Sequence, residues 1–570
     1  MKKFSKIIST LLSILLLVSC SSKKKDVINL EKDYTPLEYY HYEANDFYDK
    51  CDLLEEYAND NEIDKMNALY DELYRDCLEA MELYEICYVN YCNNVNDEYY
   101  SEEHLYSDDI ARVMKNALCS ACHNITKSSA SAEFKKHLNN DLIYEDYEEY
   151  IVKSQEILDL EARESELEQE YNEIYDSLDN YVCVVDGVTY TYGKRGEIDS
   201  ADIYWKVCSD CLKDFNEDCG DIYLELVDIR DEIAKYYGYA NFAEYADEKM
   251  YYRDYHTSDL ENFKKLTKEF GYYMFYDLIY FNSILEDIDL DGDALVKTTL
   301  PILTDISSLI NDAYTIFDKY KLYSIDSGEG RYGGSFMTSL DFNKSAYLFL
   351  SCSNSEQDYY TLAHEFGHFT NGLAVPNYNP VAVDGCYDVF EIHSTGLEGL
   401  FGLKAESIFK DRLNDANSLN ICDKFYSIID GLVYDDFQRA VYENPDMTLD
   451  EINEIFDKTY EEYGVKQFYE ENGSGYVDAL KYEWTLVHHN FDDPMYYVSY
   501  ATSAFAALQI FTTGLDNYKK AVKIWENIVL SNPYVDGYLK IVSDAGLKTF
   551  NDEEAVYDTY IKAFEYIEQE

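Results

Sequence analysis

Proline is scarce in this chain. Only 7 of the 570 residues are proline, and none lies between Pro36 and Pro301. Proline removes a backbone donor and breaks helices, so its absence permits long uninterrupted helices over this stretch. Apolar residues recur there at spacings of three and four, as in Met66, Leu69 and Leu73, which is the helical period. The sequence therefore predicts a mainly α-helical fold.

Basic residues are also few. The chain holds 47 Lys and Arg against 112 Asp and Glu, which gives a formal net charge of −65. Nucleic acid is excluded as a partner, because a phosphate backbone requires a surface of the opposite sign. Disorder is excluded by the 47% of hydrophobic and 16% of aromatic residues. The negative field favours cationic peptides as ligands.

Long apolar runs are missing except at the N-terminus. Lys2, Lys3 and Lys6 precede an apolar stretch at 7–18 that is too short to span a bilayer as a finished helix. This stretch ends in Leu-Val-Ser-Cys, with Cys20 last. The pattern resembles a bacterial lipoprotein signal, in which residues 1–19 are removed and Cys20 is lipidated. The alternative is an ordinary secretory signal that is cleaved near Ser19.

The lipoprotein reading predicts where the protein resides. Residues 20–35 form a polar, lipidated tether, and the protein is exported and anchored to the bacterial cell membrane by acyl chains on Cys20. The chain has 14 cysteines in all. The others are odd in number and irregularly spaced, so we expect buried, unpaired thiols rather than a disulfide framework or a redox motif.

Two short segments interrupt the helical pattern. Residues 184–191 are β-branched around Asp186-Gly187, which predicts a hairpin. This hairpin suggests a boundary between an N-terminal helical region, 36–195, and a catalytic domain, 196–570. The second segment contains Gly333 and Gly334, followed by a short apolar strand at 347–351.

The second segment runs almost directly into the most informative motif of the chain. A strand there could pair with an extended peptide by β-augmentation, which makes Gly333, Gly334, Phe349 and Ser351 candidate substrate-strand residues. The alternative is a hairpin that only packs against its neighbours.

Residues 364–368 read His-Glu-Phe-Gly-His, an HExxH motif in a helical stretch. His364 and His368 are four apart, so they lie one turn apart on one helical face. Two neutral imidazoles in this arrangement can hold one zinc ion. Glu365 lies beside them and can take a proton from the attacking water. The motif predicts a metal site with Glu365 as the general base.

A catalytic zinc needs a third protein ligand and an open position. The metzincin pattern would place a histidine at position 374, but this residue is alanine, so that class is excluded. The downstream candidates are Asp388, Glu391, His393 and Glu398. Glu391 and Glu398 are seven apart on one helical face, so that one can bind the metal while the other supports the site. The residues alone leave the choice among the four open.

With these motifs in place, the chain resembles the thimet oligopeptidase and oligoendopeptidase F family of zinc peptidases. Glu391, Ser394 and Glu398 match the Glu-x-x-Ser-x-x-x-Glu pattern that follows HExGH in that family, and residues 333–336 are similar to its glycine-rich segment. The resemblance covers about 234–570. It implies that Glu391 is the third ligand and that Glu398 supports the site. It also implies an elongated, two-lobed, mainly α-helical metallopeptidase with a deep substrate channel and a small β-sheet beside the HExxH helix.

A segment rich in histidine and tyrosine at 488–503 resembles the family's tyrosine loop. His489, Tyr497 and Tyr500 match best, with His488 as the alternative histidine. Imidazole N–H and tyrosine hydroxyl groups can stabilise the oxyanion of the transition state. A further tyrosine of the family falls near Asp493.

The predicted function is that of a zinc metalloendopeptidase that hydrolyses short, unfolded oligopeptides outside the cytoplasmic membrane. One alternative is a non-catalytic surface lipoprotein that binds peptides or metal, although a binder has no need of Glu365. Another keeps the chemistry but removes single residues, as a carboxypeptidase does.

Overall fold

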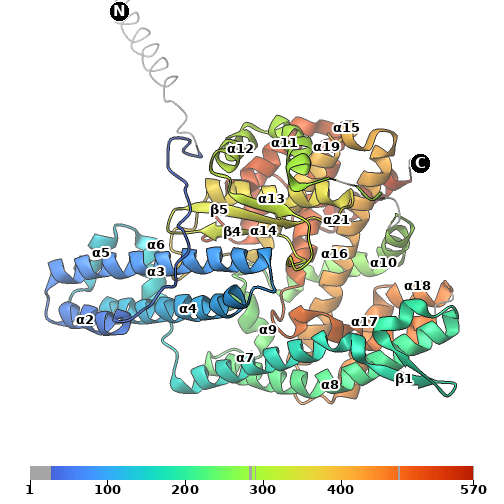
Figure 1. Ribbon diagram of the computed structural model, residues 1–570, viewed down its shortest axis with the longest axis horizontal. Helices are drawn as coiled ribbons and strands as arrows, with labels where there is room; N and C mark the ends of the chain where they lie inside the picture. The colour runs from blue at the N-terminus through green and yellow to red at the C-terminus, as the bar shows by residue number, and fades with distance from the viewer. Residues whose placement is uncertain (1–26, 282–284, 289, 473–474, 569–570) are drawn as a thin grey trace, which may run out of the picture.

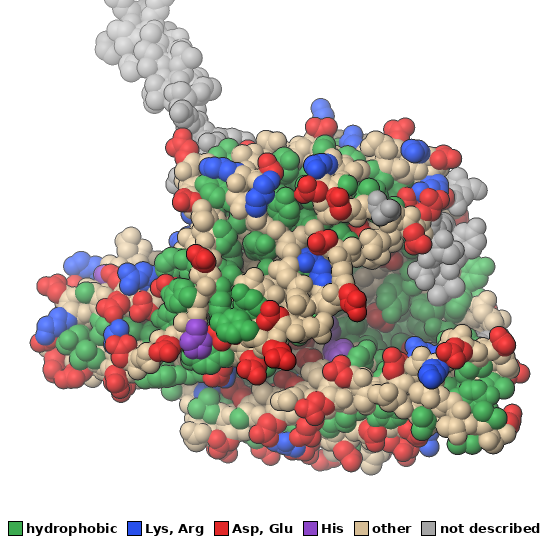
Figure 2. All heavy atoms as spheres, in the orientation of Figure 1, with side chains coloured by type: hydrophobic (Ala, Val, Ile, Leu, Met, Phe, Trp, Pro, Cys, Tyr) green, Lys and Arg blue, Asp and Glu red, His purple; other side chains and the backbone are tan. Residues whose placement is uncertain are grey.

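The computed structural model describes residues 27–281, 285–288, 290–472 and 475–568. The predicted signal at 1–19 and Cys20 lie outside these residues. Residues 47–149 form a helical bundle that projects to one side, residues 155–236 lie along the bottom, and a larger block above contains the sheet (Figure 1). No helix of the described residues has the length and apolar character needed to cross a membrane. Figure 2 shows the surface deeply hollowed between the upper block and the lower helices.

The bundle has a core of its own. It consists of α2 (Phe47–Asn59), α3 (Ile63–Asn93), α4 (Glu98–Thr126), α5 (Ser131–Leu138) and α6 (Asp141–Glu149). Leu54, Met66, Leu73 and Leu118 are at most 1% exposed and pack together. The carboxylate of Asp97 caps α4 by accepting hydrogen bonds from the backbone N–H groups of residues 99 and 100. The spacing of three and four thus places the apolar side chains on the inner faces of long helices.

The lower layer begins with α7 (Gln155–Asp176). Ile157, Leu167 and Tyr171 of α7 pack into the main core rather than into that of the bundle. The predicted hairpin follows, with β1 (Val182–Val185) antiparallel to β2 (Val188–Thr191). Asp186 and Gly187 have φ of 52° and 81°, as the tight turn requires. The hairpin is therefore confirmed, and α7 before it packs with the main core.

The upper block holds a three-stranded sheet. Its order is β3 (Tyr323–Asp326), β5 (Ser345–Ser351), β4 (Phe336–Leu340), with β5 parallel to β3 and antiparallel to β4. The apolar strand is confirmed, but both of its edges are occupied. Phe349 is 0% exposed and packs on Val89 and Cys92 of α3. Phe349 therefore cannot lie on a strand open to substrate, and the edge strands of the sheet are β3 and β4.

Two helices below the sheet position the site. These are α13 (Gln357–Ala374) and α14 (Tyr387–Gly402), packed on α16 (Leu413–Tyr442) and α19 (Val498–Val529). Gly367, inside the HExxH motif, lies where α13 and α14 touch. A Cβ atom at this position would lie 2.3 Å from the carbonyl oxygen of His393. Only glycine allows this approach, which brings the histidines of α13 onto the acidic face of α14.

The remaining helices complete the lower layer and the upper block. They are α8 (Ala201–Tyr236), α9 (Phe242–Tyr245), the π-helix η3 (Ala246–Met250), α10 (Glu261–Phe281), α11 (Gly292–Ile306), α12 (Ser308–Tyr320), α15 (Glu406–Phe409), α17 (Leu449–Glu462), α18 (Val465–Glu471), α20 (Tyr538–Ala545) and α21 (Glu553–Ile567). The 3₁₀ segments are η1 (Leu178–Asn180), η2 (Tyr192–Glu197), η4 (Thr257–Leu260), η5 (Lys410–Arg412), η6 (Gly475–Asp478), η7 (Leu480–Leu486) and η8 (His488–Asn490). The thirteen cysteines from Cys51 to Cys422 are buried free thiols.

Candidate metal centre and active site

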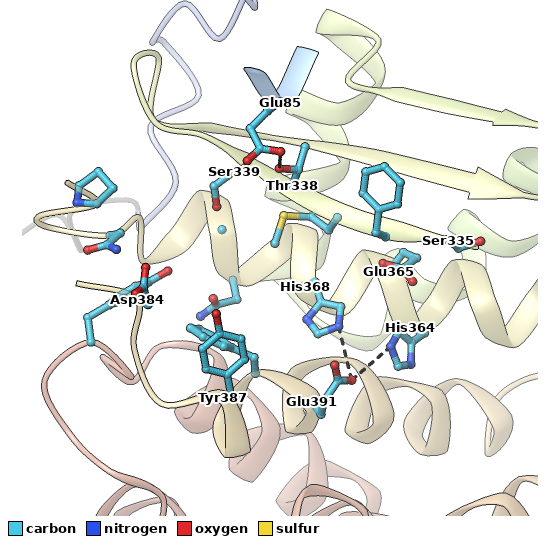
Figure 3. A pocket seen from close by; sticks show the side chains of 18 of the residues that line it. Glu85, Ser335, Thr338, Ser339, His364, Glu365, His368, Asp384, Tyr387 and Glu391 are labelled. Atoms are coloured by element: carbon cyan, nitrogen blue, oxygen red, sulfur yellow. Dashed lines mark hydrogen bonds and ion pairs between the residues drawn. The ribbon is translucent and has the colours of Figure 1, made fainter. Parts of the chain in front are cut away.

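His364 and His368 project from one face of α13 toward Glu391 of α14 (Figure 3). The Nε2 atoms of His364 and His368 lie 3.4 Å and 3.6 Å from Oε2 of Glu391. The potential ligand atoms of the three residues lie within 4.8 Å of one another. Two imidazoles and one carboxylate are a donor set that suits zinc and leaves one position open.

Glu398 lies two helical turns after Glu391 in α14 and supports this arrangement. Its Oε1 lies 2.6 Å from Nδ1 of His364, and its Oε2 accepts hydrogen bonds from Asn420 (2.7 Å) and Lys424 (2.6 Å) of α16. Burial alone would raise the pKa of Glu398, but the Lys424 ammonium and the hydrogen bond with His364 lower it to about 2. A charged Glu398 holds the proton of His364 on Nδ1 and leaves Nε2 free for a metal.

The other candidates for the third ligand point elsewhere. Asp388 is 0% exposed and accepts a hydrogen bond from Arg253 at 3.5 Å. His393 is also 0% exposed, and neither ring nitrogen bonds to any described residue. Burial lowers the pKa of His393 to about 3, so its ring is neutral. The sequence leaves four candidates for the third ligand. Of these, the structure brings Glu391 close to both His364 and His368.

Glu365 faces the same space from α13. It is 5% exposed, and its Oε2 has no hydrogen-bond partner among the described residues. Burial raises the pKa of this carboxyl, and the neighbouring histidines counteract the effect. A buried, unpartnered carboxylate oxygen beside three ligand atoms fits a group that binds water and accepts its proton.

A cavity of about 800 Å³ opens from the histidines toward the C-terminal end of β4. The β4 residues from 336 to 339 line it together with Glu85 of α3 and Asp341. Figure 3 shows Glu85 beside Thr338. Glu85 accepts a hydrogen bond from Thr338. Burial raises the pKa of Glu85 to about 7 and that of Asp341 to about 6. Sequence reasoning missed Glu85, because it resembles the many other glutamates of the bundle helices.

A second cavity, of about 370 Å³, lies at the other end of the HExxH helix. Gly333 and Ser351 line it together with His364 and Glu365. Gly334 is not among its lining residues, and a Cβ atom there would meet the ring of Tyr332. Two of the four predicted substrate-strand residues therefore reach the site, and Phe349 and Gly334 do not line it.

The tyrosine segment, defined here as residues 488–500, runs from η8 to the start of α19. Tyr496 and Tyr500 line the large cavity together with Glu391, and the ring centroid of His489 lies 5.3 Å from that of Tyr496. His488 instead packs on Tyr171 and Tyr175 of α7.

The structure places Tyr496 where the sequence suggests Tyr497. Tyr497 does not line this cavity; its ring lies 4.7 Å from that of Tyr434 of α16 and 5.1 Å and 5.5 Å from those of His489 and Tyr500. Burial raises the pKa of both Tyr496 and Tyr500, and the charge of Glu391 adds to the effect. Both hydroxyls therefore stay protonated and can donate hydrogen bonds. No sequence signal separates two adjacent tyrosines, because the direction of each side chain depends on the turn before α19.

Comparisons with known proteins extend these observations. No model of a known protein family matches the chain. The chain is 26% identical over 184 residues to group B oligopeptidase PepB of Streptococcus agalactiae, which is 31% of this chain and 28% of the relative. It is 24% identical over 209 residues to an oligoendopeptidase F homolog of Lactococcus lactis subsp. lactis, 35% of this chain and 33% of the relative. The matched segments thus span a third or less of these relatives.

Solved structures share the fold over nearly the whole chain. A structure described as a putative oligoendopeptidase F has a TM-score of 0.71 at 19% identity and covers 95% of this chain and 99% of its own. PZ peptidase A with an inhibitor has a TM-score of 0.72 at 17% identity, with 94% and 99% covered. These likenesses establish the mainly α-helical peptidase fold. The sequence matches and the common fold together confirm the resemblance of this chain to the thimet oligopeptidase and oligoendopeptidase F family.

Proposed function

We propose that this protein is a zinc metalloendopeptidase that hydrolyses short, unfolded oligopeptides. The observation that carries the proposal is the convergence of His364, His368 and Glu391 beside the unpartnered carboxylate of Glu365. A non-catalytic metal-binding protein would need the first three residues but not the fourth.

The metal-binding residues fit zinc by their chemistry and by their support from Glu398. Bound there, zinc would act as a Lewis acid that polarises the scissile carbonyl group and the water. Glu365 accepts a proton from the attacking water and later delivers it to the leaving amine. Its Oε2 has no hydrogen-bond partner among the described residues, so this oxygen is available for both proton transfers.

Tyr496 and Tyr500 line the cavity opposite the metal ligands, and His489 lies beside them in an adjoining cavity of about 500 Å³. Both tyrosine hydroxyls are protonated, because burial and the charge of Glu391 raise their pKa. Hydroxyl and imidazole N–H donors aimed at the cavity stabilise negative charge that develops on the carbonyl oxygen. We assign the predicted role of Tyr497 to Tyr496.

The shape of the site favours an endopeptidase over a carboxypeptidase. Cavities extend from His364 and Glu365 in both directions along α13, one toward Asp341 and the other toward Gly333 and Ser353. An extended peptide can therefore continue on both sides of the bond that is cut. The free edge of β4 offers backbone groups for pairing with such a peptide, whereas a folded protein cannot present an extended strand in an enclosed cavity.

The enzyme proposal is tested with purified protein, a zinc measurement and a peptide library. We expect one zinc per chain and cleavage inside peptides of about ten residues. Glu365→Gln should retain zinc and lose turnover. Stoichiometric zinc without cleavage of any peptide would favour the non-catalytic alternative, and release of single C-terminal residues would favour a carboxypeptidase.

We also propose that the enzyme is exported and anchored by acyl chains on Cys20. The proposal rests on the basic residues, the apolar stretch and the Leu-Val-Ser-Cys sequence of residues 1–20. In bacteria that express the full chain, the protein should be found with membranes and should incorporate labelled fatty acid. Cys20→Ala should abolish the label, and labelling that persists would contradict the anchor.

A further inference from the structure

The side chain of Arg253 lies buried behind the tyrosine segment. Arg253 belongs to the loop between η3 and η4, and its guanidinium is 0% exposed. Its Nη2 donates to the carbonyl oxygen of Met495 and to Oγ of Ser499, each at 2.9 Å. These residues immediately precede Tyr496 and Tyr500. One nitrogen therefore holds the backbone beside both tyrosines of the proposed active site.

The other side of the guanidinium reaches the helix of the third metal ligand. Nε of Arg253 donates to Oδ1 of Asp388 at 3.5 Å, and Nη1 donates to Asp247 at 2.7 Å. Asp388 lies in α14, one turn before Glu391. Arg253 thus connects the helix that presents Glu391 with the segment that presents the tyrosines.

A chain of buried ion pairs fixes the guanidinium in place. Asp247 also accepts hydrogen bonds from Arg439 at 2.8 Å and 3.1 Å. Arg439 donates to Asp435 at 2.9 Å, and Asp435 accepts from Lys264 at 2.6 Å. Charges alternate along this chain, so each buried group has a partner of opposite sign. The position of Arg253 is therefore set by α10, α16 and η3 as well as by its own loop.

The backbone that Arg253 holds is strained. Met495 has a φ of 68°, in the left-handed region that residues other than glycine avoid. Its N–H donates to Oε1 of Gln438 at 2.6 Å, and the hydroxyl of Tyr251 donates to the carbonyl oxygen of Pro494 at 2.8 Å. Such a conformation persists only where surrounding contacts impose it. Without the guanidinium, we expect residues 494–500 to relax.

We propose that Arg253 is a positioning residue that sets the separation between Glu391 and the hydroxyls of Tyr496 and Tyr500. The inference rests on the proposed peptidase function, since the two tyrosine hydroxyls act by stabilising the transition state of peptide hydrolysis. Arginine is required because its planar group presents five N–H donors in fixed directions, while the four acceptors lie on different elements. A lysine ammonium keeps the charge but cannot reach all four at once.

The test compares Arg253→Lys with the wild-type enzyme on a fluorogenic peptide. We expect kcat to fall about 10- to 100-fold, because a shift of about 1 Å in the donors weakens transition-state binding. KM should stay within about twofold, since substrate binding on the β4 side is unchanged. The affinity for a phosphinic peptide, which imitates the tetrahedral transition state, should fall by the same factor as kcat. Zinc content should not change.

Arg439→Lys is the matched control. Arg439 belongs to the same ion-pair chain and is 8% exposed at its side chain, but its hydrogen bonds go to Asp247 and Asp435 rather than to the tyrosine segment. If Arg253 contributed only to the stability of the fold, the melting temperature and the activity of both variants would fall alike. We expect similar losses of thermal stability but a kcat within about threefold of wild type for Arg439→Lys, because lysine keeps a cation beside Asp247 and the bonds of Arg253 to Asp388, Met495 and Ser499 do not involve residue 439.

Several outcomes would overturn the inference. A folded Arg253→Lys enzyme with wild-type kcat, or an equal loss of kcat in both variants, would do so. If Arg253→Lys does not fold, Ser499→Ala tests the same role, because it removes one acceptor of Arg253. We expect this variant to lower kcat about 3- to 10-fold at constant KM. Wild-type kcat in that variant refutes the role. A wild-type protein that cleaves no peptide refutes the proposed function itself, and this result is distinct from all the others.

Discussion

Replacing Glu398 by glutamine would remove one negative charge from the support of the metal site while keeping its shape. The carboxylate accepts hydrogen bonds from Asn420 and Lys424 and lies 2.6 Å from Nδ1 of His364. Two effects follow. His364 loses the charged partner that keeps its Nε2 available to a metal, and the ammonium of Lys424 is left buried beside a neutral amide.

The magnitudes of both effects, weaker metal binding and lower stability, can be estimated from the structure. Loss of a carboxylate that orients a metal-binding histidine typically weakens metal binding about 10- to 100-fold. A carboxyl whose pKa falls from 4.5 to about 2 is stabilised in its charged form by about 3 kcal/mol. Because Glu398 is only 6% exposed, little of this value is lost to solvent screening, and we expect unfolding to become easier by about this amount.

The assay combines competition for zinc by a chelator with thermal unfolding of the metal-free protein. A second variant, Glu398→Gln with Lys424→Met, separates the two effects, because it removes both charges at similar volume. We expect the double variant to recover most of the lost stability, since no unpaired ammonium remains. Its zinc affinity should stay as low as that of the single variant.

The results can refute either part of the reasoning. Zinc affinity within twofold of wild type in Glu398→Gln would show that this carboxylate does not orient His364. A double variant no more stable than the single one would show that the buried charge of Lys424 is not the source of the instability.

Three further predictions concern the tyrosines, the acidic end of the cavity and the contact between the metal helices. Tyr496→Phe and Tyr500→Phe should each lower kcat about 100- to 1000-fold with little change in KM, while Tyr497→Phe should stay within a few-fold of wild type, as steady-state kinetics on one peptide can measure. The raised pKa of Glu85, about 7 in the folded protein, means that its charging opposes folding as the pH rises from about 4.5 to about 7. Glu85→Gln should therefore match wild type in stability below about pH 4.5 and exceed it by up to about 3 kcal/mol above pH 7, as denaturant unfolding at the two pH values can show. Gly367→Ala should separate α13 from α14, because its Cβ atom would lie 2.3 Å from a backbone oxygen, and should lower both zinc content and melting temperature.

Each of these has an outcome that contradicts it. Equal losses of kcat in Tyr496→Phe and Tyr497→Phe would show that Tyr497 also takes part in catalysis. A stability difference between Glu85→Gln and wild type that does not grow with pH would mean that the carboxyl of Glu85 is not desolvated in the folded protein. A Gly367→Ala protein with full zinc content would mean that the two helices can separate without harm to the ligand set.

Local sequence determined those features that depend on a single element. The HExxH spacing places His364 and His368 on one helical face, whatever that helix packs against. The turn at Asp186 and Gly187 needs only two residues with positive φ between β-branched runs. The apolar run at 347–351 is a strand because it is buried on both faces, and such strands read as continuous hydrophobic sequence.

Tertiary structure decided which of several equivalent side chains reach the site. Asp388 and Glu391 lie one turn apart in α14, yet Arg253 binds the first, and the close contact at Gly367 presents the second to the histidines. The sequence makes Phe349 a plausible substrate residue, but α3, which comes from the N-terminal part of the chain, covers its side chain.

The same holds for the wall opposite the metal. Tyr496 and Tyr497 are identical in chemistry, and the strained turn at Met495, held by Arg253 and Gln438, directs one into the cavity and the other toward Tyr434. Glu85 joins the site from α3 across more than two hundred residues of sequence. Periodicity gives the direction of a side chain within its element, but the identity of its neighbours depends on packing between elements that no local pattern encodes.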